Sequence, residues 1–121
     1  MSRDFRKLRA FQLADSLVTD IYRVAVGFPA DERYGLLSQL KRAAVSAPAN
    51  IVEGSARRTT AEFVNFVNIA AGSSAEARYL VELSGRFGFV SKEETLLMMA
   101  RYAELQGQLH ALMRSLRDLS S

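Results

Sequence analysis

The chain has 121 residues, of which 49% are hydrophobic and 24% are charged, and this composition is typical of one globular domain. No apolar run approaches the roughly 20 residues of a membrane span, the charged N-terminus lacks the apolar segment of a signal peptide, and the absence of cysteine excludes disulfides, thiolate metal sites and cysteine nucleophiles. The net charge of +3 is mildly basic, and a cytoplasmic location fits these features best.

The whole formal charge excess lies in the first ten residues, where Arg3, Arg6, Lys7 and Arg9 are balanced only by Asp4. Such a basic arm, over about residues 1–6, can attract phosphate groups or acidic partners. It can equally be a solvated end that keeps the protein soluble. Apolar residues at steps of three and four then predict a first helix over about residues 6–26, and a glycine and a proline within residues 27–30 predict its end.

A second helix is predicted over about residues 32–56, with Asp31 as its N-terminal cap and Pro48 inside it as the cause of a kink. Apolar residues surround this helix on nearly all sides. It nevertheless carries one polar stripe, whose members are spaced by four, four and three positions: Arg42, Ser46, Asn50 and Glu53. Polar groups inside an apolar helix must find partners or they destabilise the fold.

The stripe, together with Glu62, Ser73 and Glu76 of the next helix, allows two interpretations. One is a site in which the carboxylates of Glu53 and Glu76 bind a metal or transfer protons. The other is a buried network in which Arg42 faces one or both carboxylates and Asn50 satisfies the backbone near Pro48. We interpret the stripe as a structural network, which could also fix the helix register, with these members: Arg42, Ser46, Asn50, Glu53, Ser73 and Glu76.

Two capping boxes mark the remaining helices. The pair Thr59 and Glu62 predicts the start of a third helix over about residues 60–87, which Gly88 ends. The apolar arc of that helix is Phe63, Phe66, Ile69, Ala70, Leu80, Leu83 and Phe87. The pair Ser91 and Glu94 predicts the start of a fourth helix. Its apolar residues form a heptad seam: Met98, Tyr102, Leu105, Leu109, Leu112 and Leu116.

Four helices of about 20 to 28 residues with short connections predict an all-α, antiparallel, up-down-up-down four-helix bundle, as a single domain over residues 1–121. The second helix needs cover on more sides than one bundle usually gives. Small side chains over residues 70–75 would permit close approach of another helix. Both features favour a subunit interface, and tight packing within one bundle is the alternative.

Several segments of the chain resemble a known family, the 23S rRNA intervening-sequence proteins, also called S23 ribosomal proteins. They are Phe28-Pro29, Glu32-Arg33-Tyr34-Gly35-Leu36, Gln39, Arg42-Ala43-Ala44-Val45-Ser46, Pro48-Ala49-Asn50-Ile51, Glu53-Gly54-Ser55 and Ala71-Gly72-Ser73. The resemblance covers residues from about 5 to 116. It implies a four-helix bundle that forms ring-like homopentamers. Distantly similar pentameric bundles assist the reverse transcriptases of diversity-generating retroelements, which makes nucleic-acid binding plausible.

Motifs of common enzyme classes are absent from the sequence, since it contains no Gly-x-Gly-x-x-Gly, Walker loop or nucleophile elbow. A di-metal site in a helix bundle normally uses Glu-x-x-His. The single histidine of the chain, His110, has Gly107 in the position where that motif needs Glu. We therefore expect no enzymatic activity, no cofactor and no bound metal.

Nucleic-acid binding is the main functional hypothesis, and the candidate residues are basic: Arg3, Arg6, Lys7, Arg9, Arg57, Arg58, Arg114 and Arg117. In an up-down bundle the N-terminal arm, the connection between the second and third helices and the end of the fourth helix can share one pole, which would bind phosphates. No aromatic residues interleave with these basic residues, so binding would follow the backbone rather than the base sequence. The partner would be RNA or a nucleic-acid-processing protein. The alternative is a protein-interaction or scaffolding module without nucleic-acid binding.

Overall fold

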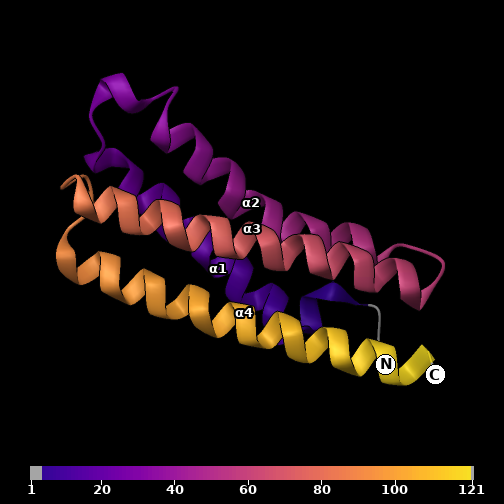
Figure 1. Ribbon diagram of the computed structural model, residues 1–121. Coiled ribbons are helices and arrows are strands. Elements are labelled where there is room, and N and C mark those ends of the chain that lie inside the picture. Colours follow the sequence, from indigo (N-terminus) through magenta and orange to yellow (C-terminus); the bar gives the residue numbers. More distant parts are fainter. Residues whose placement is uncertain (1–3, 121) are drawn as a thin grey trace.

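The computed structural model describes residues 4–120, and within this range the chain forms helices and no strand (Figure 1). The four long helices are α1 (Arg9–Val24), α2 (Leu36–Ser55), α3 (Thr60–Arg86) and α4 (Lys92–Ser120). Short 3-10 helices precede and follow α1: η1 (Phe5–Lys7), η2 (Ala25–Gly27) and η3 (Ala30–Glu32). The predicted all-α four-helix bundle is confirmed. No helix of the described residues is both long enough and apolar enough to cross a membrane.

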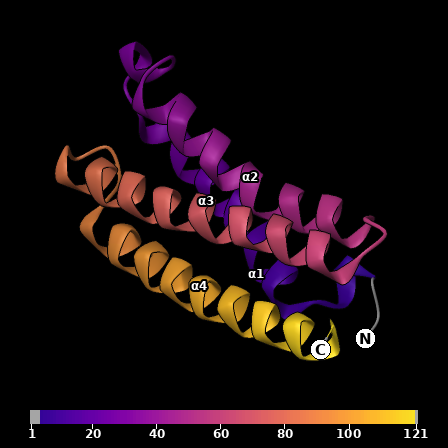
Figure 2. The same cartoon turned by 45° about the vertical axis from the view of Figure 1, so that its right-hand side comes forward.

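Each helix packs against two neighbours, so that α1 contacts α2 and α4, and α3 contacts the same two helices from the other side. Figures 1 and 2 show consecutive helices running in opposite directions. The heptad seam predicted for α4 is buried at all six positions. The largest side chains of the core come from all four helices: Leu17, Ile21, Leu40, Ile51, Phe63, Val67, Tyr102, Leu105 and Leu109.

Thr59 and Ser91 cap the helices at the two predicted capping boxes, although the carboxylate of Glu62 bonds the Thr59 hydroxyl and that of Glu94 bonds Arg23. The Thr59 hydroxyl accepts a hydrogen bond from the backbone N–H of Glu62 at 3.1 Å, and the Ser91 hydroxyl accepts one from that of Glu94, also at 3.1 Å. Caps of this kind typically stabilise a helix by about 1 kcal/mol. Gly88 ends the turn after α3 with φ of 79°, a conformation that glycine adopts without steric cost.

The predicted cap of α2 at Asp31 is wrong, because residues 30–32 form η3 and α2 begins only at Leu36. The carboxylate of Glu32 accepts a hydrogen bond from the backbone N–H of Leu36 at 3.1 Å. Glu32 therefore satisfies one free N–H of the first turn, which is the task that the sequence reasoning gave to Asp31. Pro48 lies inside α2 and is buried.

The predicted apolar face of α3 is partly wrong. Ile69 and Phe87 are 50% and 58% exposed, whereas small residues that the prediction omitted form much of the buried stripe: Val67, Ser74, Ala77, Val81 and Ser84. The two buried serines remain satisfied because their hydroxyls donate to the carbonyls of Ala70 and Leu80 at 2.8 and 2.7 Å. Small side chains on this stripe let α3 approach both α2 and α4 closely.

Candidate functional site

Seven of the eight basic candidates lie in segments that meet at one end of the bundle; the eighth, Arg3, lies outside the described residues. We call this surface the basic end, defined by Arg6, Lys7, Arg9, Arg57, Arg58, Arg114 and Arg117. Figures 1 and 2 both show the start of α1, the α2–α3 connection and the end of α4 on the same side of the molecule. All seven residues are exposed. The structure thus brings together residues that are up to about a hundred positions apart.

Packing at the basic end fixes how these segments lie. Arg9 lines a pocket of about 240 Å³ with Leu112 and Ser115, so the start of α1 sits against the last turns of α4. At the α2–α3 connection, the Arg57 guanidinium donates to the Glu53 carboxylate at 2.6 Å and lies 4.9 Å from the centre of the Phe66 ring. Arg57 is therefore partly neutralised by its own chain.

The basic end is less uniformly positive than the sequence pattern indicates. Asp4, Glu53, Glu62 and Asp118 lie on the same segments as the basic residues. Aromatic rings are also closer than expected, because the Arg6 guanidinium lies 4.5 Å from the centre of the Phe5 ring. Phe5 and Phe66 are only partly exposed, and a guanidinium of the same chain lies over each ring, where it competes with a stacking base.

The polar stripe of α2 lies at the outer boundary between α2 and α3 rather than in the core. The hydroxyls of Ser46 and Ser73 lie 2.7 Å apart, and the Asn50 amide donates to the Ser46 carbonyl and hydroxyl at 2.8 and 3.0 Å. These three half-buried residues form a chain of hydrogen bonds, in which Asn50 bonds the backbone carbonyl two residues before Pro48.

The predicted roles of Arg42, Glu53 and Glu76 are wrong for the single chain, because all three side chains are exposed. The Arg42 guanidinium makes a long contact of 3.5 Å to the Ser38 hydroxyl, and Glu53 pairs with Arg57. Glu62, the other carboxylate considered, is exposed, and it accepts a hydrogen bond from the hydroxyl of the cap residue Thr59 at 2.9 Å. The physical reason is that α2 buries the row of Leu40, Ala44, Ala47 and Ile51 in the core. The charged row of the same helix therefore lies in water, where a charged group has its lowest free energy.

A pocket of about 360 Å³ opens on this α2–α3 boundary. It is lined by Tyr34, Gln39, Arg42, Ala43, Ser46, Ser73 and Glu76. Arg42 and Glu76 line the same pocket without an ion pair between them or to another residue of 4–120. Polar residues from the segments that resemble the known family therefore gather around one open hollow.

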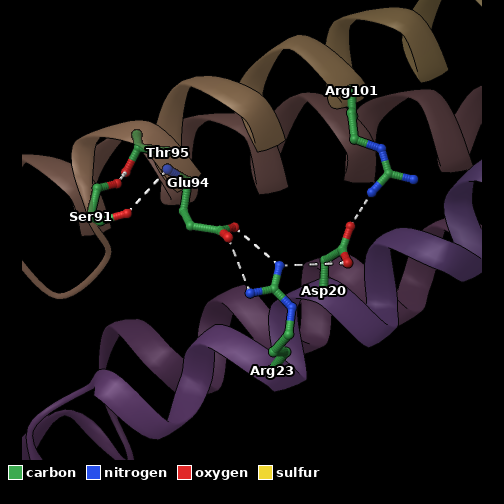
Figure 3. Close-up of polar contacts among 6 residues, drawn as sticks. All are labelled: Asp20, Arg23, Ser91, Glu94, Thr95 and Arg101. Carbon is green, nitrogen blue, oxygen red and sulfur yellow. Dashed lines mark hydrogen bonds and ion pairs between the residues drawn. The ribbon is translucent and has the colours of Figure 1, made fainter.

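Sequence reasoning missed a polar tie between α1 and α4, which Figure 3 shows. Arg23 donates to both carboxylate oxygens of Glu94 at 3.2 and 3.0 Å and lies 3.7 Å from Asp20. Asp20 also accepts from Arg101, which donates to the Ser16 hydroxyl at 2.9 Å. The available signal was weak: Glu94 and Arg101 are seven residues apart beside the α4 seam, but nothing in α4 alone identifies their partners.

The tie changes the titration of its members. Hydrogen bonding to the Arg23 guanidinium lowers the pKa of Glu94 below its ordinary value. Next to the tie, burial raises the pKa of the Tyr102 hydroxyl, and the charge of Asp20 adds to this effect. The Tyr102 hydroxyl has no hydrogen-bond partner among residues 4–120. Tyr102 therefore stays neutral at physiological pH.

In the described part of the chain, no three His, Asp or Glu side chains lie close enough to hold a metal ion. His110 is exposed on α4. What the two surfaces offer chemically is recognition, through guanidinium groups at the basic end and through charges of both signs at the α2–α3 pocket.

A family model described as 23S rRNA-intervening sequence protein matches residues 6–111 of the chain. Among solved structures, a protein of unknown function from the S23 ribosomal protein family of Bacteroides thetaiotaomicron VPI-5482 is similar, with a TM-score of 0.79 and 21% identity. That match covers 86% of this chain and 97% of the other, and at this identity it shows the fold alone. No curated protein matches the chain.

Proposed function

This chain belongs to the 23S rRNA-intervening sequence protein family, and we propose that it is a non-enzymatic, self-associating four-helix bundle that binds RNA or other nucleic acid through its basic end. The observation that carries the proposal is the convergence of three basic segments, distant in sequence, on one end of the bundle (Figures 1 and 2). Their seven basic side chains are exposed, so a phosphate chain can reach them without any change of fold.

The chemistry of this surface favours contact with the phosphate backbone. Arginine presents a planar fork of donors that fits phosphate oxygens, whereas the two nearby phenylalanine rings already lie against guanidinium groups of the same chain. Binding is therefore tolerant of sequence and sensitive to salt, because each phosphate contact releases counterions. The carboxylates on the same segments keep the affinity moderate.

Self-association supports this function because it repeats the basic end around an assembly. The family resemblance implies that this assembly is a ring-like homopentamer. Exposed apolar side chains on α2 and α3 favour it: Val45 is 41% exposed and Ile69 is 50% exposed. Exposed apolar side chains of this size are found on surfaces that bind another protein. Measurement of the mass in solution by light scattering tests this part; a mass of one chain would reject it.

Titration of single-stranded RNA of mixed sequence with the protein at two salt concentrations tests the nucleic-acid part. We expect binding at low salt that weakens steeply at higher salt. Absence of binding at low salt would instead favour the second candidate, a protein-interaction or scaffolding module whose basic end recruits acidic partners. The exposed α2–α3 face is the observation that supports this second candidate, since it offers a contact surface independent of RNA.

A further inference from the structure

The pocket of about 240 Å³ at the basic end has a lining that phosphate contacts alone do not use. It lies where the start of α1 meets the last turns of α4. Its walls are mainly apolar, with one basic and two polar side chains among them: Leu8, Arg9, Ala10, Gln108, Ala111, Leu112 and Ser115. A pocket of this volume is smaller than those that enclose drug-sized ligands. It therefore suits one small ring system.

Gln108 brings an unused hydrogen-bonding group to this pocket. The side chain is half-buried and lines the pocket, and its Oε1 atom is shut off from water without a hydrogen-bond partner among residues 4–120. A buried acceptor that lacks a donor destabilises the fold. Because Oε1 has no hydrogen bond to lose, turning it toward a ligand N–H group in the pocket would gain one.

The edge of the pocket favours a negative charge. Arg9 is exposed there, and Lys7 and Arg114 are the exposed chain neighbours of the lining residues Leu8 and Ser115. Helix α1 begins at Arg9 without a side-chain cap and without an acidic residue in its first turn. The first N–H groups of a helix lack intrahelical partners and lie at the positive end of its dipole. A ligand that combines an N–H-bearing ring with a phosphate group meets these requirements.

We propose that this pocket holds one unstacked base of a bound single-stranded nucleic acid. Gln108 accepts a hydrogen bond from an N–H group of the base, and Arg9 contacts the adjoining phosphate. The inference rests on the proposed function and adds a base contact to its phosphate contacts. Apolar walls cover the faces of the ring, as in other pockets that take single bases. Because every base carries an N–H group on its pairing edge, the contact favours unpaired bases rather than one sequence.

Two single-stranded RNAs of equal length and charge test the proposal, one of mixed sequence and one built entirely of abasic nucleotides. Affinity for each is measured at low salt with the wild type and three variants whose fold is checked by circular dichroism. Gln108→Leu removes the acceptor, and Ser115→Leu narrows the pocket. Gln106→Leu is the matched control, because this half-buried glutamine of α4 lines a different pocket, against α3.

We expect the wild type and Gln106→Leu to bind the mixed-sequence RNA about fivefold or more tightly than the abasic chain. Gln108→Leu and Ser115→Leu should each reduce this ratio by about half or more, with unchanged affinity for the abasic chain. Either variant decides the question if the other does not fold, and the wild-type comparison of the two RNAs needs no variant.

Equal binding of the two RNAs by the wild type would overturn the base pocket and leave phosphate binding through the basic end intact. A preference for bases that both pocket variants keep in full would also overturn it, since the bases would then bind elsewhere, such as at Phe5 or Phe66. If neither RNA binds at low salt, the proposed function fails together with this inference.

Discussion

Arg23 of α1 and Glu94 of α4 lie 71 positions apart in the chain and form an ion pair through two hydrogen bonds, at 3.2 and 3.0 Å. With Asp20 and Arg101 this pair joins the first helix to the last (Figure 3). The tie lies toward the end of the bundle opposite the basic end, where α1 ends and α4 begins. It holds α1, whose far end carries part of the basic end, against the rest of the fold.

The Arg23–Glu94 pair makes stability depend on pH in the acid range. The pKa of Glu94 is lowered in the folded protein relative to its ordinary 4.5, so its contribution is present above about 4.5 and is lost as the pH falls through the lower, folded value. Glu94→Gln should therefore be less stable than the wild type at neutral pH. The difference should shrink in acid.

Chemical denaturation of both proteins at about pH 7 and pH 3 checks this prediction. Glu93→Gln, at the exposed neighbouring position, is the control and should change stability little at either pH. A Glu94→Gln variant as stable as the wild type at neutral pH would show that the pair does not stabilise the fold.

Tyr102 should tolerate loss of its hydroxyl but not of its ring. The side chain is 1% exposed and its hydroxyl has no partner among residues 4–120, so Tyr102→Phe should leave stability within about 1 kcal/mol of the wild type or raise it. Tyr102→Ala removes the ring from the core and should cost about 3 to 5 kcal/mol. Denaturant unfolding of the two variants measures both effects.

Alkaline pH gives an independent reading of the same residue. The pKa of Tyr102 is raised in the folded protein above its ordinary 10.0, so the unfolded chain loses this proton first and the wild type loses stability above about pH 10. Tyr102→Phe removes the ionisable hydroxyl and with it this loss of stability. The variant should gain stability relative to the wild type between about pH 9 and 11; an unchanged difference would contradict the buried, neutral hydroxyl.

The helical glycines should respond to alanine with opposite signs. A Cβ atom at Gly85 would lie 2.3 Å from the Thr95 hydroxyl and 2.6 Å from its methyl group, so Gly85→Ala should cost roughly 1 to 3 kcal/mol. Thr95→Ala in the same chain should recover part of that loss. Gly72→Ala meets nothing and should stabilise the helix of the separate chain by up to about 1 kcal/mol. Thermal melts of the four proteins at low concentration check the order.

The sequence predicted the bundle and α4 well for a simple physical reason. Large apolar residues at steps of three and four, such as Leu105 and Leu109, define one side of a helix without ambiguity. The capping boxes at Thr59 and Ser91 are equally local, since each needs only neighbouring residues. Local patterns were therefore enough for the helix order and for most of the helix ends.

The candidate sites could be predicted only in part, because they depend on packing between distant segments. In α3 the buried stripe uses Ser74 and Ser84, whose hydroxyls bond their own helix, and a hydrophobic pattern does not identify them. In α2 apolar residues lie on all sides, so periodicity alone could not show that Arg42 faces water. The three basic segments do lie at one end of the bundle, because an up-down topology fixes which connections share an end; nucleic-acid binding by their residues stays a prediction.

The measurement that tests the central claim most directly is the salt dependence of RNA binding by two matched charge variants. One removes Lys7 and Arg58 from the basic end (Lys7→Gln with Arg58→Gln). The other removes Arg78 and Lys92, two exposed basic residues on α3 and α4 away from that end (Arg78→Gln with Lys92→Gln). Both variants lose two positive charges, so they differ only in the position of the lost charges.

We predict that the logarithm of the wild-type affinity for single-stranded RNA falls linearly with the logarithm of salt concentration. The basic-end variant should show a slope shallower by about 0.7 for each lost phosphate contact, and the Arg78 and Lys92 variant should match the wild type. Equal slopes for the two variants, or no binding by the wild type at low salt, would contradict nucleic-acid binding through the basic end.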